Sequence, residues 1–172
     1  VAVVLLFVAF PAAFSAILTA LHIPITLMLI GIVLRGSAFA FRSYSAGAEE
    51  IERRSARVFA VSSLATPLML GVTAGAVASG DLALADSGVV ETDFLSAWLA
   101  PFPFAIGLFT LALCAFLAAV YMTVETDGDL AEDFRRRALW SALAVGVAAA
   151  ASALLARDGA PVIWQGLTGE VW

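Results

Sequence analysis

The chain has 172 residues, of which 62% are hydrophobic and 13% charged, with a mean hydropathy of +1.00. Soluble domains are about 45–50% apolar and about 25% charged, so this composition excludes an ordinary soluble protein and indicates a membrane protein. The net charge is −5, and all nine basic residues are arginines. No basic face with interleaved aromatic residues is present, so nothing indicates nucleic-acid binding.

Five apolar stretches are long enough to cross a membrane, since a spanning helix needs about 20 residues. Their approximate limits are residues 1–20, 23–41, 58–78, 102–123 and 138–156. Lipid offers no hydrogen-bond partners to open backbone groups, so the stretches are predicted to be helices. We therefore predict an all-α, polytopic transmembrane helix bundle in a single domain over residues 1–172. Pro11 should kink the first helix, and the tight link at 21–24 should make the first two helices an antiparallel hairpin.

The connections between these helices differ in charge. Arginines are concentrated in residues 42–57, which hold four of them, and in residues 124–137, which hold three. Residues 79–101 carry only acids, and the tail 157–172 carries one arginine. Arginine-rich short loops stay in the cytoplasm. We therefore expect loops 42–57 and 124–137 to be cytoplasmic, and loop 79–101 and the tail to lie outside.

Smaller features give further expectations. Gly71 and Gly75 form a small-xxx-small step that fits either ordinary small-residue packing or a specific dimer contact. Trp98 and Trp140 lie near helix ends and are expected in the interfacial aromatic belts. Cys114 is the single cysteine and lies within an apolar run, so it is expected to be a small buried residue without a disulfide or metal role.

Arg35 is the only charged residue within the five stretches. It lies seven residues before Arg42, which is roughly 10 Å along a helix. Its side chain either snorkels to the cytoplasmic headgroups or is a buried charge with a partner. An ionisable residue at that depth costs about 2.5 kcal/mol or more, so it marks a candidate functional site. No acid lies within any other stretch, so a carboxylate partner is expected to come from helices missing from this sequence or from another subunit.

Several segments resemble one family in the order in which the family has them. They are Phe10-Pro11, GIVLRGSAFAFR (31–42), PFPFAIGLFTLALCAFLAAVYMTVET (101–126), DFRRRAL (133–139) and GLTG (166–169). Together they resemble subunit II of the cytochrome bd-type quinol oxidases, over nearly the whole chain. That family usually has an acid two residues before the closing arginine of the second segment, where this chain has Ala40. A proton-relay role is therefore not carried over to this position.

The resemblance implies an eight-helix subunit of two similar halves. On that mapping the chain is expected to be a fragment that holds the second to sixth helices and lacks the first and the last two. The complex would oxidise quinol and reduce dioxygen to water in the bacterial cytoplasmic (inner) membrane. The haem-bearing subunit I, with haem b and haem d, would be the partner, together with membrane lipids and quinone. This chain is expected to hold no cofactor.

Haem b needs axial His or Met ligands, and the only histidine, His22, is expected in a turn near the outer interface. No catalytic, cofactor-binding or metal residue is therefore predicted. Arg35 is the candidate for a buried polar contact. The candidate lipid or interface contacts are Arg42, Glu125, Arg135, Arg136 and Arg137. Two other functions stay open, namely a small secondary transporter or channel, for which the interruptions at Pro11 and Pro67 speak, and a purely structural scaffold.

Overall fold

The computed structural model describes residues 2–44, 49–80, 82 and 95–169, and within these ranges it contains helices and no strands. Four helices are long: α3 (His22–Tyr44), α4 (Glu49–Ser79), α5 (Pro101–Glu125) and α6 (Asp129–Gly159). Three are short: α1 (Ala2–Ala9), α2 (Pro11–Ala20) and α7 (Pro161–Thr168). The four long helices are each long and apolar enough to span a membrane, and the α1–α2 pair would make a fifth span if counted as one. The predicted all-α polytopic bundle of about five spans is thus confirmed.

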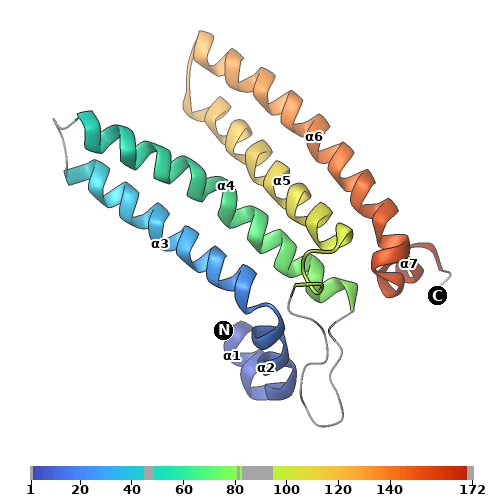
Figure 1. The fold of residues 1–172 in the computed structure, drawn as a ribbon. Helices are drawn as coiled ribbons and strands as arrows, with labels where there is room; N and C mark the ends of the chain where they lie inside the picture. Colours follow the sequence, from blue (N-terminus) through green and yellow to red (C-terminus); the bar gives the residue numbers. More distant parts are fainter. Residues whose placement is uncertain (1, 45–48, 81, 83–94, 170–172) are drawn as a thin grey trace.

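The long helices lie side by side in an up-and-down row (Figure 1). Helix α3 packs on α4, α4 on α5, and α5 on α6, and in the described part of the chain no extensive contact joins long helices that are not consecutive. The row is therefore an open layer with two large faces rather than a closed bundle. Both faces are apolar and exposed, because each helix buries only the stripes that touch its neighbours.

The first predicted helix is not a single kinked span, because the chain turns by 118° between α1 and α2. Pro11 is the first residue of α2 and has no backbone N–H with which to continue α1. The two pieces fold together, with the Phe7 and Phe14 rings 5.3 Å apart in an edge-to-face arrangement. They lie together near the beginning of α3 (Figure 1), so the expected antiparallel hairpin along α3 is wrong.

Glycines let α4 and α5 approach closely. A Cβ atom on Gly71 would lie 2.5 Å from Thr110 Oγ1 and 2.7 Å from the Gly107 Cα atom. A Cβ atom on Gly75 would lie 2.7 Å from the Pro103 Cα atom. The small-xxx-small step is therefore a contact within the chain, where it brings two helix backbones together.

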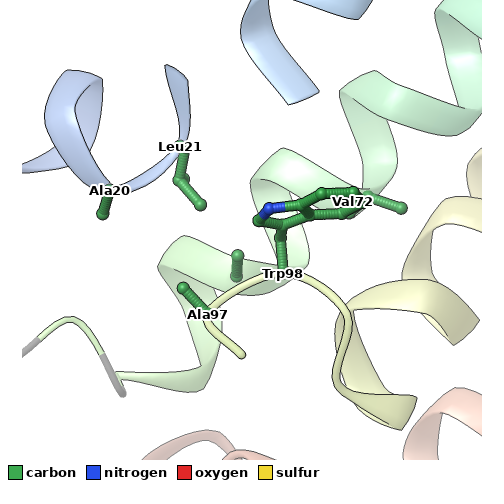
Figure 2. Packing of buried hydrophobic residues seen from close by; sticks show 6 residues of the cluster. Ala20, Leu21, Val72, Ala97 and Trp98 are labelled. Carbon is green, nitrogen blue, oxygen red and sulfur yellow. The ribbon is translucent and has the colours of Figure 1, made fainter. Parts of the chain in front are cut away.

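Trp98 packs inside the chain rather than in an exposed aromatic belt. Its side chain is only 9% exposed and belongs to a buried cluster with Ala20, Leu21, Val72 and Ala97. Figure 2 shows the indole beside Leu21 and Val72, so the segment before α5 fastens the α2–α3 corner to α4. The expectation of an interfacial Trp98 is therefore wrong, because its side chain is covered by protein, including Leu21 and Val72. Trp140, in contrast, is 73% exposed.

Two of the long helices begin well before their apolar stretches. Helix α4 starts at Glu49 and α6 at Asp129. Each begins with acidic residues, which stabilise the positive N-terminal end of the helix dipole. Ion pairs one turn apart extend these polar first turns, as between Arg54 and Glu50 at 2.8 Å and between Arg137 and Asp133 at 2.8 Å. Hydropathy marks only the part of a helix that lies in the apolar layer, so these extensions are invisible to it.

We predict that Gly71→Ala destabilises the protein by about 1–3 kcal/mol, because the added methyl group overpacks the contact with α5. Gly146→Ala is the matched control, since nothing lies within 4 Å of a Cβ atom there and it shares the gain in helix propensity. Thermal unfolding of the detergent-solubilised protein measures both. Equal melting temperatures for the two variants would show that the close approach is not needed.

Candidate functional site

Arg35 lies on the line of contact between α3 and α4. Its helix neighbours at i−4 and i+3, Gly31 and Ala38, are both buried. A Cβ atom on Gly31 would lie 2.5 Å from Thr66 Oγ1 of α4, so the two helices touch closely one turn away from Arg35. The guanidinium is therefore held beside α4, although the side chain itself is exposed.

The nearest partner of this charge is an aromatic ring. The Arg35 guanidinium carbon lies 5.3 Å from the centroid of the Phe59 ring on α4, which is cation–π distance. Phe59 stands between the buried Ser55 and Ser62, four and three residues away, so it occupies the same seam of α4. Within the described ranges Arg35 forms no ion pair with an acid. Aromatic contact offsets only part of the cost of a charge at membrane depth.

A cavity of about 480 Å³ opens next to Arg35 and runs over α4 to α5. Its polar wall comes from Arg35, Ser63 and Thr66. The Thr66 hydroxyl donates to the carbonyl oxygen of Ser62 at 2.8 Å and is satisfied, whereas the buried Ser63 hydroxyl has no partner. Pro67 has no N–H, so the Ser63 carbonyl also lacks its usual donor four residues on.

This combination of groups defines what the cavity can hold. It offers a permanent cation at Arg35, whereas the unpaired Ser63 hydroxyl beside it is buried. A carboxylate or a phosphate would satisfy the guanidinium. An apolar group alone would leave this charge unsatisfied, which is costly in lipid.

A second cavity, of about 310 Å³, adjoins the first. The two share Ala115 and Ala118 of α5 as walls, and the second ends at Phe134 and Arg137 of α6. The guanidinium carbon of Arg137 lies 5.8 Å from the Phe134 ring centroid. We call the surface that carries both cavities the Arg35 face. It runs across α5 between two arginines that each rest on an aromatic ring.

Cys114 lines the Arg35 cavity and is exposed, so its expected burial is wrong. The reason is that α5 has neighbours on two sides only, and its remaining surface lies on the open faces of the layer. The hydropathy of the segment could not separate a residue packed against protein from one on such a face.

The remaining candidate residues lie at the ends of the helices. Glu125 is the last residue of α5 and is exposed. Arg135 and Arg136 reach the same carboxylate, Glu132, at 3.6 and 3.5 Å. Arg42 lies near the end of α3, and its side chain falls outside the described part of the structure. Among the candidates whose side chains the structure describes, Arg137 is the one that lines the Arg35 face.

The described residues were compared with what a haem or a metal ion needs. The His22 ring is exposed, and its Nδ1 atom lies 2.8 Å from the Thr19 carbonyl oxygen, as in a side chain that caps a helix end. Among the described residues, no group of three His, Cys, Asp or Glu side chains could hold a metal ion.

Phe59 and Ser63 are functional candidates that hydropathy and charge did not reveal. A signal was present in the spacing, because Ser55, Phe59, Ser62 and Thr66 follow one helical stripe. Pro67 gave a second signal, since a proline four residues after Ser63 frees that carbonyl. Neither pattern says on which helix the matching arginine lies.

These features together define a polytopic helical membrane protein with an ionisable site facing outward from one side of a helix layer. The family model for cytochrome bd terminal oxidase subunit II matches residues 1–168. The chain therefore belongs to that family, as its resemblance predicted. Members of the family are subunits of a respiratory quinol oxidase complex in the bacterial inner membrane, which agrees with the spanning helices found here. No curated protein matches the chain.

We predict that Phe59→Leu lowers the free energy of unfolding by about 1 kcal/mol, because leucine keeps an apolar side chain but removes the ring face under Arg35. A double-mutant cycle with Arg35→Gln should give a coupling energy of about 0.5–2 kcal/mol. Thermal unfolding of the four proteins measures it. Strictly additive effects would contradict a direct interaction between the two side chains.

Proposed function

We propose that this chain is the non-haem subunit of a membrane quinol:dioxygen oxidoreductase. Family membership over residues 1–168 supports an oxidase subunit, and the chemistry of the described residues supports the absence of a redox centre here. When bound, haem b and haem d of the partner subunit supply the electron transfer and the oxygen reduction. This chain then holds the haem-bearing subunit in the membrane.

The Arg35 face is the surface that we assign to protein contact. Its supporting observation is the charge of Arg35, which has aromatic contact with Phe59 but no acid among the described residues. A charge left unpaired against hydrocarbon is costly, so an acidic group from elsewhere in the complex covers this face.

Access of small molecules is a second part of the proposed role. A cavity of about 490 Å³ lies along α5 and α6, with walls of Ala, Leu, Val and the exposed Trp140. Such walls suit an apolar molecule such as dioxygen, whereas protons need polar groups. The guanidinium of Arg35 is a polar group on a cavity wall that suits a water-lined route. Ala40 has only a methyl group and takes no part in proton transfer.

We further propose that the α3–α4 and α5–α6 connections face the cytoplasm. The end of α3, the beginning of α4 and the turn between α5 and α6 lie at the same end of the layer (Figure 1), and the arginines near them follow the positive-inside rule. In a Cys114→Ser background, Asp127→Cys should react with a membrane-impermeant maleimide only in inside-out vesicles. Leu99→Cys should react only in right-side-out vesicles, and the reverse pattern would overturn this orientation.

The proposed function is tested by purifying the tagged full-length protein from its native membranes and recording a reduced-minus-oxidised absorbance spectrum. Haem b and haem d bands should co-purify with the protein, and the chain expressed without its partner should show none. Absence of haem from both preparations would favour a transporter or channel. Haem in the isolated chain would contradict the assignment of a non-haem subunit.

We predict that Arg35→Leu lowers the level of assembled oxidase, because it leaves an acidic group of the complex buried and unpaired. Loss of one partner of a buried pair costs about 3–5 kcal/mol, enough for a loss of about tenfold or more. Haem content and oxygen consumption measure it. Arg53→Leu is the control, since Arg53 is exposed at the end of α4. Arg35→Lys should restore little if the contact is bidentate. Unchanged haem and turnover in Arg35→Leu would contradict the assigned contact.

A further inference from the structure

Two grooves lie on the layer away from the Arg35 face, and each ends at an arginine. The Arg135 groove, of about 280 Å³, lies between α5 and α6 and is lined by Phe116, Val120, Thr123, Val124, Arg135, Ala138, Leu139 and Ala142. The Arg54 groove, of about 230 Å³, lies between α3 and α4 and is lined by Leu34, Ser37, Ala38, Phe41, Arg54, Ser55 and Val58.

The spacing of the lining residues places these grooves opposite the Arg35 face. The second cavity of the Arg35 face, which ends at Arg137, is lined on α5 by Ala115, Ala119 and Met122. The Arg135 groove is lined on the same helix by Phe116 and Val120. Successive helix residues point about 100° apart, so the two sets flank the α5–α6 contact from opposite sides. On α3, likewise, Arg35 lines one cavity and its neighbour Leu34 lines the other groove.

The walls of the Arg135 groove are apolar and suit an apolar ligand. Val124 is 81% exposed and Leu139 is 65% exposed. The one hydroxyl among the lining residues, on Thr123, donates to the carbonyl oxygen of Ala119 at 2.9 Å and needs no further partner. Below the arginine, nothing in the groove would hold a polar group, in contrast to the Arg35 cavity with its unpaired Ser63 hydroxyl.

The end of the groove at Arg135 suits a negatively charged group. Arg135 and Arg136 both approach Glu132, at 3.6 and 3.5 Å, so a single carboxylate faces two guanidinium groups at long distances. The acids of this helix come first, at Asp129 and Glu132, and the arginines follow within about one or two turns toward the apolar part. This order places acids farther into water and arginines at the depth of lipid phosphates. Helix α4 repeats it, with Glu50 before Arg54.

We propose that the Arg135 groove binds one anionic phospholipid, with its phosphate on Arg135 and an acyl chain along the apolar walls. In a phospholipid the charged phosphate lies at the membrane surface and the acyl chain points toward the membrane centre. Arg135 and the apolar walls of the groove follow each other in the same order. The Arg54 groove differs, because Arg54 already pairs with Glu50 at 2.8 Å and Ser37 and Ser55 are among its lining residues. The site depends only on membrane insertion of the layer and not on the proposed oxidase role.

Lipid titration of the intact complex in nanodiscs tests the charge. Phosphatidylglycerol bound to the complex is counted by native mass spectrometry, with phosphatidylcholine as the neutral lipid. Arg135→Gln should weaken phosphatidylglycerol binding about fivefold, as expected for one arginine near the surface, and leave phosphatidylcholine unchanged. Arg53→Gln is the matched control, because Arg53 is at the same end but lines neither groove. Equal losses in both variants, or none in Arg135→Gln, would overturn the site.

Inorganic phosphate separates a lipid from a free anion. It should not displace phosphatidylglycerol at concentrations that leave the complex intact, because the acyl chain supplies much of the binding. Displacement would show a plain anion site and would overturn the proposal.

Photocrosslinking tests the apolar part of the site. A photoreactive amino acid at Leu139 in the complex should yield an adduct with the mass of a phospholipid. An adduct with another polypeptide would show that protein covers the groove. The absence of any adduct would show that the groove is empty. Either result would overturn the proposal. The same residue at Ala118, on the Arg35 face, should instead crosslink to protein, so a failure of the protein-contact assignment can be told apart from a failure of the lipid site.

Discussion

The arrangement of the long helices depends on close backbone contacts made by α4 on both of its sides. On one side Thr66 touches Gly31 of α3, and on the other Gly71 and Gly75 touch α5. Helices in lipid gain no hydrophobic driving force from meeting, so they need close packing to associate. Small residues provide that packing here and hold α4 between its neighbours. The position of Arg35 over Phe59, and the cavity beside it, follow from this contact.

An open layer has two faces, and charge distinguishes them. One face carries Arg35 at membrane depth with an unpaired Ser63 hydroxyl beside it, whereas the Arg135 groove on the other side has apolar walls and an arginine at its end. Protein can supply a fixed acidic partner at depth, and lipid supplies phosphate only at the surface. The same residue type thus has different consequences at different depths of one molecule.

Much of the fold could be predicted because hydrophobic length and charge in short loops are direct constraints of the bilayer. They indicated the α3, α4, α5 and α6 spans and singled out Arg35. Polar helix extensions such as residues 49–57 were not predicted, because hydropathy does not detect a helix outside the membrane. The break at Pro11 was taken for a kink, because a proline alone does not say how far the chain turns.

The sequence by itself determined the class of protein, its family motifs and the presence of one charge within an apolar helix, because each is a property of consecutive residues. Only the tertiary structure decided what surrounds that charge. Phe59, Ser63 and Cys114 come from two other helices and meet Arg35 through the angle and register of packing. The burial of Trp98 was decided in the same way, by its packing against Leu21 and against Val72 of α4. Contacts between distant segments depend on how helix surfaces fit together, and periodicity along one helix does not contain that information.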